Sequence, residues 1–351
     1  MQDKKGGILL SKIKLKTIHI GKTALENAFR FIFNLGFIMI FQILFGAENI
    51  LPGVAIGVGL TMFPDGYIGI KRKTMGGIIV ILYAGSVLAA QSALSSPWIA
   101  IIINFLFVYL IMNLICEPNE FKPAISFLLC FIFSQATPVS MEMFPKRLLG
   151  ALAGGLVVGI ITMIKWKSDN KGDDGRNLKE QILLCRKKKG YMLRMSLGIA
   201  VAMFIGMIFH IKKPLWISIV VMSLTQLHFN EMSERIRHRM FGNVIGVLVF
   251  ILLFKILIPA RYAFPMVLFL GYISFFTSEY KYKQIVNAVC AINASLVLLD
   301  VSEAIENRLF CLVGGALIVV LMFILQKIFK KFINNYNLTK LNIGEKKDIP
   351  V

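Results

Sequence analysis

Residues 73–93 read KTMGGIIVILYAGSVLAAQSA, an apolar stretch that opens with a basic residue followed three positions later by a small one. Four apolar stretches open in this way: Lys73-Thr-Met-Gly76, Arg147-Leu-Leu-Gly150, Arg239-Met-Phe-Gly242 and Arg308-Leu-Phe-Cys311. The first and third openings lie 166 residues apart, and the second and fourth lie 161 apart. This spacing predicts two copies of one membrane module, a duplication that is common among transporters.

Composition points to a membrane protein. Hydrophobic residues make up 57% of the 351 residues, charged residues make up 17%, and the mean hydropathy is +0.72. A soluble domain is about 45–50% apolar and about 25% charged. The apolar residues fall in blocks of about 15 to 22, which is the length that a helix needs to span a bilayer core. We predict an all-α fold, a polytopic transmembrane helical bundle of about 12 spans built as two repeated six-helix halves.

The predicted organisation has five parts. They are a basic cytoplasmic N-terminal segment (1–30), a first membrane repeat (31–165), a cytoplasmic linker (166–190), a second membrane repeat (191–328) and a basic cytoplasmic tail (329–351). The predicted spans of the first repeat are 31–46, 50–64, 74–93, 97–115, 122–139 and 147–165. Those of the second repeat are 191–210, 214–228, 240–258, 263–278, 284–299 and 308–327.

Basic residues are distributed unevenly over this layout. With both termini and the linker in the cytoplasm, 32 of the 39 Lys and Arg residues lie on the cytoplasmic side, as the positive-inside rule requires. The net charge of +20 also predicts attraction of the tails to anionic membrane lipid. Nucleic acid is not an expected partner, because the basic residues bracket apolar helices and form no face of a soluble domain. We expect a multi-pass protein of the cytoplasmic membrane, and an oligomer is compatible with the sequence.

The sequence contains no recognisable apparatus for covalent chemistry. Its five cysteines have no CxxC spacing, and its four histidines form no HxxxH or HExxH pair, so neither a disulfide framework nor a metal site is expected. No phosphate-binding GxxxxGK[ST] loop is present. We therefore expect a protein that is not an enzyme and that has no cofactor.

Two interruptions occur at corresponding places in the halves. In the first half the apolar stretch is broken by Gly46-Ala-Glu-Asn49 and then by Pro52-Gly53, and in the second by His210-Ile-Lys-Lys-Pro214. The segments that follow, 50–64 and 214–228, are short for a full span. Interrupted segments at matching positions of two repeats indicate a transport site. The alternative is a pair of tight extracellular hairpins that join short, tilted helices.

The basic residues that open the four stretches allow two interpretations. A lone arginine at a helix start is usually an interfacial anchor whose head lies among phosphates. However, Arg147 and Arg308 fall on the outer side of the predicted topology, where the positive-inside rule does not explain them. The small residues nearby, including Gly154-Gly155 and Gly314-Gly315, favour close helix packing. A guanidinium on such a helix is suited to hold a carboxylate in a pore.

Acidic residues are missing from the middle of every predicted span, although proton-coupled carriers usually place a carboxylate there. Proton coupling would have to use Glu48 at a helix end, or His210 or His228, whose ordinary pKa lies near physiological pH. Uncoupled, channel-like movement of anions therefore stays open.

One stretch resembles a known family. It is the run Pro214-Leu-Trp216-Ile-Ser-Ile-Val-Val-Met-Ser-Leu-Thr225-Gln226, followed by Arg235, Arg239 and Gly242-Asn243. It is similar to the signature of the fusaric acid resistance (aromatic acid exporter) superfamily, to which the plant aluminium-activated malate transporters are related. The first half matches more loosely through Asn49-Ile-Leu-Pro52, Thr61 and Lys73-Thr-Met-Gly76. The resemblance extends over about 25–330, and its sharp motif spans 214–246.

The resemblance implies export of aromatic or other organic acids. It makes Arg239 the arginine that attracts the anion or packs the gate, Trp216 an aromatic lining residue, and Thr225 and Gln226 polar lining groups. Lys73, Asn49 and Thr61 are the weaker counterparts in the first half, and the residues themselves add Arg147 and Arg308 as electrostatic contributors.

The sequence departs from the family pattern in four ways. Asn243 replaces the usual Thr, Lys73 replaces Arg, the first half has no matching Trp, and the large cytoplasmic domain of many relatives has no counterpart.

Three functions follow from these observations. The leading one is a transporter that exports small organic anions, with basic residues at helix starts holding the substrate. The second is an organic-anion channel without proton coupling. The third is a membrane scaffold or partner in envelope assembly, which transports nothing.

Overall fold

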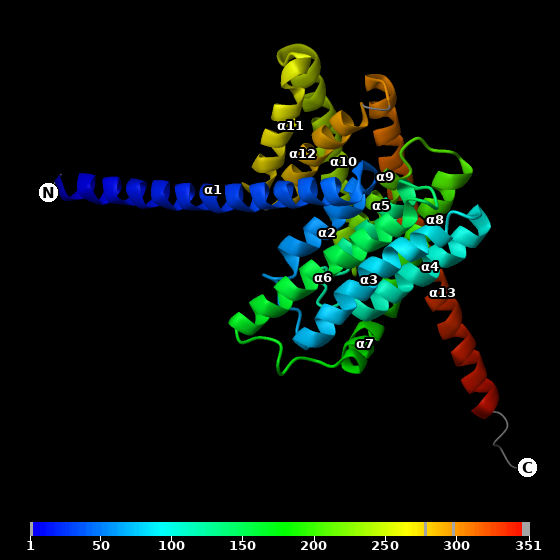
Figure 1. Ribbon diagram of the computed structural model, residues 1–351. Helices are drawn as coiled ribbons and strands as arrows, with labels where there is room; N and C mark the ends of the chain where they lie inside the picture. The colour runs from blue at the N-terminus through cyan, green and yellow to red at the C-terminus, as the bar shows by residue number, and fades with distance from the viewer. Residues whose placement is uncertain (1–2, 277–278, 297–298, 346–351) are drawn as a thin grey trace, which may run out of the picture. The chain divides into compact units, whose positions relative to one another are not determined.

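The computed structural model describes residues 3–276, 279–296 and 299–345 and confirms the all-α class (Figure 1). In these residues the only β pairing is an isolated bridge between Ile70 and Arg176. The α-helices are α1 (Asp3–Phe45), α2 (Ile50–Met62), α3 (Arg72–Ser92), α4 (Pro97–Ile115), α5 (Ile125–Ala136), α6 (Phe144–Ser168), α7 (Leu178–Arg186), α8 (Lys189–Ile208), α9 (Leu215–Leu224), α10 (Phe229–Ile251), α11 (Ala263–Ile273), α12 (Tyr280–Ser295) and α13 (Val301–Glu345).

Seven stretches of these helices are long and apolar enough to cross a membrane. They are Thr23–Phe45, Arg72–Ser92, Pro97–Ile115, Phe144–Ser168, Lys189–Ile208, Phe229–Phe254 and Val301–Lys331. The other predicted spans coincide with shorter helices, namely α2, α5, α9, α11 and the 16-residue α12. The twelve-span layout therefore stays a prediction. The amphipathic helix α7 lies in the predicted linker, where Asn177 and Glu180 form a capping box at its start.

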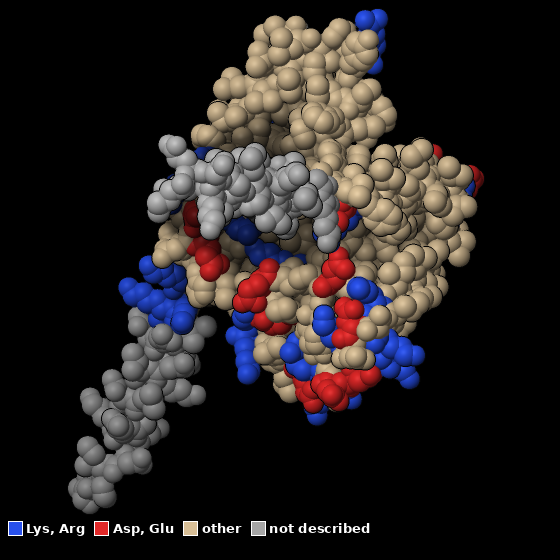
Figure 2. Space-filling model, turned by 90° about the vertical axis from the view of Figure 1, so that its left-hand side faces the viewer, with Lys and Arg blue, Asp and Glu red and all other residues tan. Residues whose placement is uncertain are grey.

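The exposed surface of the long helices is apolar, as a lipid environment requires. On α4, for example, Trp98, Ile102 and Leu106 recur every four residues and are 69%, 59% and 58% exposed. Figure 2 shows that most of the visible surface carries no charge and that Lys, Arg, Asp and Glu gather in a restricted part of it. The chain is thus a multi-pass membrane protein, because apolar stripes of this kind are stable only in contact with lipid or partner helices.

The chain forms two compact units, each of which takes helices from both halves of the sequence. The first unit comprises residues 1–50 and 237–308, and the second comprises 51–236 and 309–351. In the second unit α3 packs against α5 and α6, and α4 packs against α8 (Figure 1). A β-carbon on Gly155 of α6 would lie only 3.2 Å from the Cα of Val80 on α3, so this glycine permits the close approach that the sequence predicted.

In the first unit α10 packs against α12, and α11 packs against α12 and α1. A buried apolar cluster fills the space around α10 and α12: Val247, Phe250, Val289, Ile292, Leu299 and Ala304. A β-carbon on Gly242 would lie 2.6 Å from the Cβ of Gln284 and 3.0 Å from the carbonyl oxygen of Lys281. The small residue of the third basic opening therefore brings α10 against α12.

Helix α9 is short because both of its ends are fixed by sequence. Pro214 lies at its N-cap, where a missing amide proton does no harm. At the other end Thr225 turns to an extended backbone (φ −65°, ψ 116°), and its hydroxyl donates to the carbonyl of Val221 at 2.8 Å. Residues 225–228 then form a non-helical connection, the α9–α10 junction. A ten-residue helix covers about 15 Å, only half of a bilayer core.

Candidate functional site

Three basic side chains from different parts of the second unit converge on the end of α9. Lys122 comes from the connection before α5, Arg194 from α8 and Arg235 from α10. Their partners are oxygens of Ser223, Gln226 and Leu227. The C-terminus of a helix has unpaired carbonyls and a partial negative charge, so cations are favoured there. We call these three side chains together with the α9–α10 junction the junction site.

Gln226 is the centre of the junction site and is 3% exposed. Its amide nitrogen Nε2 donates to the carbonyls of Ser223 and Thr225 at 3.0 and 2.8 Å. Its amide oxygen Oε1 accepts from Lys122 Nζ at 2.7 Å. The Gln226 side chain therefore links the α4–α5 connection to the end of α9. Its amide oxygen faces the lysine because only that atom of the amide accepts a hydrogen bond.

Arg194 is buried beside the junction, with 7% of its surface exposed. Its Nη2 donates to the carbonyls of Gln226 and Leu227 at 2.8 and 2.9 Å, and its Nη1 donates to Gln326. The guanidinium lies over the ring of Phe323, 3.9 Å from the ring centroid. Its Nε has no hydrogen-bond partner among the described residues. Arg194 thus keeps one buried donor beside a set of neutral oxygens.

Lys122 is held under strain and in partial burial. Its φ of 52° is unusual for a residue other than glycine. The pKa of Lys122 is lowered to about 8, mainly by burial and also by the nearby charge of Arg235 on α10. Glu231, also on α10, raises this pKa. The junction site therefore includes a cation that titrates near physiological pH.

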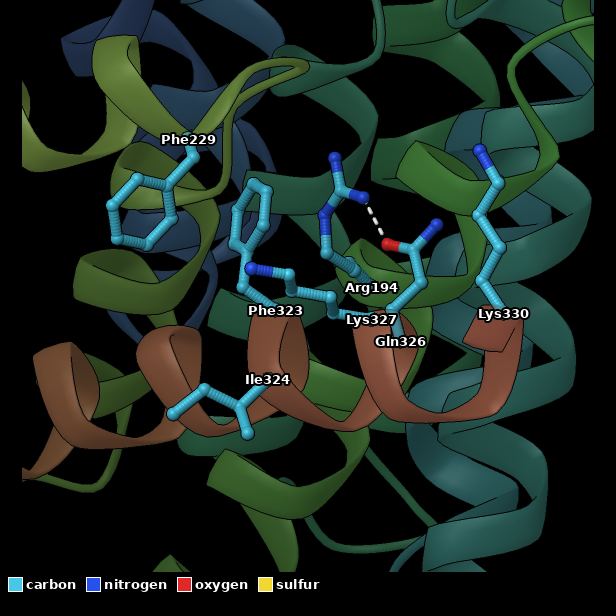
Figure 3. Close-up of a pocket in the computed structure, with 7 residues that line it drawn as sticks. All are labelled: Arg194, Phe229, Phe323, Ile324, Gln326, Lys327 and Lys330. Carbon is cyan, nitrogen blue, oxygen red and sulfur yellow. Dashed lines mark hydrogen bonds between the residues drawn. The ribbon is translucent and has the colours of Figure 1, made fainter. Parts of the chain in front are cut away.

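A groove of about 540 Å³ adjoins the junction site along α13 (Figure 3). Its lining residues are Arg194, Phe229, Phe323, Ile324, Gln326, Lys327 and Lys330. Figure 3 shows Arg194 reaching from α8 to Gln326 on α13, with the Phe323 ring beside the guanidinium. Arg194 therefore contacts both the junction carbonyls and the groove.

The opposite end of α9 has a different character. A cavity of only about 40 Å³ lies between α5, α8 and α9, and its lining includes Gln135, Met207, Pro214 and Ser218. Oε1 of Gln135 and Oγ of Ser218 are buried without a hydrogen-bond partner in the described structure. Trp216 lies in the first turn of this end and is 5% exposed. The named lining of this small cavity is neutral, and Lys212 and Lys213 lie directly before Pro214.

The sequence-predicted residues fall in three places. Thr225 and Gln226 lie at the junction site, and Trp216 lies at the other end of the same helix. Arg239 and Arg308 come together in the first unit through Asn243. Arg308 Nε donates to Asn243 Oδ1 at 3.0 Å, and Asn243 Nδ2 donates to the carbonyl of Arg239 at 2.8 Å. The Asn that departs from the family pattern therefore connects two of the four basic openings.

The other predicted residues stand apart from these clusters. Arg147 is 3% exposed, and its Nη1 donates to the carbonyls of Ser134 and Thr137 at 3.0 and 2.6 Å, where it caps the end of α5. Asn49 is buried, and its Nδ2 donates to the carbonyl of Phe45 at 2.6 Å. Lys73 and the proton-coupling candidates Glu48, His210 and His228 are exposed.

Sequence reasoning named none of the three basic residues of the junction site as a site residue. It counted Lys122, Arg194 and Arg235 as cytoplasmic charge. A usable signal existed for Arg194, because it lies four residues inside the apolar segment 191–210. An ionisable residue within a membrane helix indicates a functional site.

The fold defines an all-helical, multi-pass membrane protein that buries several basic side chains. Residues 201–322 match the model of a family described as fusaric acid resistance protein-like. The match confirms the resemblance drawn from the motif at 214–246. Comparison with curated proteins gives no match, and comparison with solved structures gives none either. The family is one of transporters, in keeping with a role other than catalysis.

Proposed function

We propose that this protein exports small organic acid anions, aromatic acids among them, across the cytoplasmic membrane, with the anion passing along α9. The observation that carries the proposal is the convergence of Lys122, Arg194 and Arg235 on the non-helical end of α9. Helix breaks at membrane depth occur where backbone is buried in protein or lines a watery path, and transporters bind substrate at such breaks.

The electrostatics of the junction favour an anion. Lys122 and Arg194 hydrogen-bond neutral amide and carbonyl oxygens, which offset only part of the cost of burying a charge. A carboxylate placed beside them would form charge-assisted bonds of about twice the strength of neutral ones. The Nε of Arg194, which has no partner among the described residues, would donate to such a carboxylate.

We infer that a path along α9 would be constricted at one end. The junction end carries charge, whereas the cavity of about 40 Å³ at the Pro214 end has room for about one water molecule. An anion at the junction would have to widen this cavity to leave. The Ser218 hydroxyl, which has no hydrogen-bond partner in the described structure, would donate a hydrogen bond to the passing anion.

Packing supports the two-repeat, twelve-span layout that we propose. In the second unit α3 packs with α5 and α6. In the first unit α10 packs with α12, and the start of α13 reaches α10 through Arg308 and Asn243. Likewise α4 packs against α8, and α11 packs against α1. In the predicted layout α1 corresponds to α8, α3 to α10, α4 to α11, α5 to α12 and α6 to α13. Each of these contacts in one half therefore has its counterpart in the other half, as a duplicated module requires.

The remaining site assignments extend this proposal. Arg239 and Arg308 would act together through Asn243 as a second basic centre, and Trp216 would line the closed end of α9. Arg147, Lys73 and Asn49 stay as weaker electrostatic or polar contributors. Both termini are proposed to lie in the cytoplasm, because this placement satisfies the positive-inside rule.

Efflux from proteoliposomes tests the proposal. Vesicles loaded with labelled benzoate, salicylate or malate are compared for the native chain, Arg194→Gln and the control Arg186→Gln, which removes an exposed arginine of α7. We expect the native chain to release the anion faster than loaded vesicles without protein, Arg194→Gln to lose most of this efflux, and the control to keep it. If the folded native protein releases no anion faster than protein-free vesicles do, the proposal fails and the scaffold hypothesis takes its place.

A channel is the second candidate, favoured by the exposure of Glu48, His210 and His228. Exposed groups at helix ends are poorly placed for a proton relay. Flux through a channel would rise linearly with anion concentration and ignore an imposed pH step. Carrier flux would saturate and respond to the step.

A further inference from the structure

We propose that the groove along α13 binds an anionic phospholipid from the membrane, with the lipid phosphate at Lys327 and Lys330 and an acyl chain against Phe229 and Phe323. The groove is the one of about 540 Å³ drawn in Figure 3. This ligand is distinct from the transported anion.

The groove has the chemistry of an anionic amphiphile. Lys327 and Lys330 lie three residues apart, so they share one face of α13. Among the described residues neither lysine forms an ion pair with a carboxylate. The remaining wall is mainly apolar and aromatic, through Phe229, Phe323 and Ile324. The two lysine ammonium groups would bind the headgroup phosphate, and the phenylalanine rings would pack against an acyl chain.

The position of the groove on α13 selects a lipid over a soluble anion. The apolar span of this helix extends from Val301 to Lys331, so both lysines lie at its final turns. The surface beside them is apolar and exposed, with Ile324 at 47%, Ile328 at 58% and Phe329 at 64%. In a membrane this surface faces acyl chains. Basic residues at the end of a span bind anionic headgroups at this depth.

A lipid in the groove would contact the groups that hold Arg194. The guanidinium of Arg194 lies on Phe323 and bonds Gln326, and both residues line the groove. An occupied groove would therefore restrict Arg194 and so affect the junction site. This consequence concerns the same arginine as the proposed transport, but lipid binding itself does not depend on transport.

Equilibrium binding of a fluorescent phosphatidylglycerol to the full chain in neutral detergent tests the proposal. Phosphatidylcholine is the neutral lipid control. The test variant is Lys327→Gln with Lys330→Gln, and the matched control is Lys179→Gln with Lys187→Gln, which removes two exposed lysines around α7. We expect preference for phosphatidylglycerol in the native chain. Affinity should fall roughly fivefold per lysine, and so roughly twenty- to thirtyfold in the test variant, while the control variant keeps native affinity.

Soluble probes separate a lipid site from a site for free anions. Glycerol 1-phosphate and benzoate are added as competitors, and Phe229→Ala is measured beside the native chain. The proposal predicts that neither competitor displaces the lipid at millimolar concentration and that Phe229→Ala weakens lipid binding. Displacement that depends on Lys327 and Lys330 would assign the groove to soluble anions and overturn the proposal.

Two further results would contradict it. One is equal affinity of the native chain for both lipids. The other is equal affinity of the test and control variants for phosphatidylglycerol. If the test variant does not fold, salt dependence of the native chain decides. Phosphatidylglycerol binding that weakens with added salt, while phosphatidylcholine binding does not, supports the site, and binding without salt dependence overturns it.

Discussion

The two ends of α9 differ in chemistry. At the Thr225 end, Lys122, Arg194 and Arg235 surround backbone and amide oxygens. At the Pro214 end, the neutral Gln135 and Ser218 line a cavity of about 40 Å³. In the proposed function, the side chains that other helices bring to each end of α9 decide whether that end binds an anion or restricts its path.

Loss of the charged end should have the largest effect. Arg194→Ala removes two bonds from a buried guanidinium to the carbonyls of Gln226 and Leu227, each a charge-assisted bond of about 1.5–3 kcal/mol. We expect organic-anion efflux to fall by about a hundredfold, which corresponds to about 3 kcal/mol. Arg194→Lys keeps the charge without the planar fork and should fall between native and Ala. Native-like efflux in Arg194→Ala would show that the charged end is not used.

Filling the neutral end should have a smaller effect. Ser218→Leu forces a large side chain into the cavity beside Pro214, at a cost of about 1–3 kcal/mol. We expect efflux to fall about tenfold, while binding of the anion at the junction is kept. Ser218→Ala is the matched control, because it removes an unpartnered buried hydroxyl and should leave stability nearly unchanged. A loss of anion binding in Ser218→Leu would contradict the separation of the two ends.

Arg147 is a buried arginine that caps α5 and lies outside the junction site. Arg147 donates to the carbonyls of Ser134 and Thr137, so Arg147→Met leaves the end of α5 without this cap. We expect a loss of about 1–3 kcal/mol in unfolding free energy, measured by thermal unfolding in detergent. The ratio of benzoate to malate efflux should stay native. A changed ratio would show that Arg147 takes part in substrate recognition and does not only cap α5.

The smallest effect is the pH dependence of Lys122. Its pKa is about 8 in the folded protein, against an ordinary value of 10.5. Between these two pH values the unfolded state binds one proton that the folded state lacks, so stability should rise with pH across this window. Lys122→Met should abolish this part of the pH dependence in thermal unfolding, and Lys171→Met, which alters an exposed lysine, should not. An unchanged profile in Lys122→Met would contradict the assigned pKa.

Much of the fold could be predicted because bilayer thickness fixes the length of apolar segments. The all-α class follows from that length, and the shortness of α9 follows from Pro214 and Thr225. The small residue at Gly242 correctly predicted close packing, which the structure places against α12. At the N-terminus, α1 extends as one helix from Asp3 to Phe45, and the division of the chain at residue 30 stays a prediction.

The site was predicted only in part, for a physical reason. Thr225 and Gln226 were named because they belong to the motif that resembles the family, and a motif of this kind is a local signal. The partners of Gln226 lie 104 residues earlier, at Lys122, and 32 residues earlier, at Arg194. Such contacts depend on which helices pack together, and the packing of helices cannot be predicted from the periodicity within one helix. The link from Arg308 to Asn243 was hidden for the same reason.

The chemical accessibility of the two ends of α9 shows whether an anion binds at the junction site. Leu227→Cys and Ser218→Cys are made in a chain whose five native cysteines are replaced, and each is treated with a charged thiol reagent in vesicles, with and without benzoate. We expect the cysteine at 227, a half-buried position of the junction, to react and to be protected by benzoate. The cysteine at 218, where the native residue is 1% exposed, should not react. Equal reaction at both positions, unaffected by benzoate, would contradict an anion site at one end of a closed path.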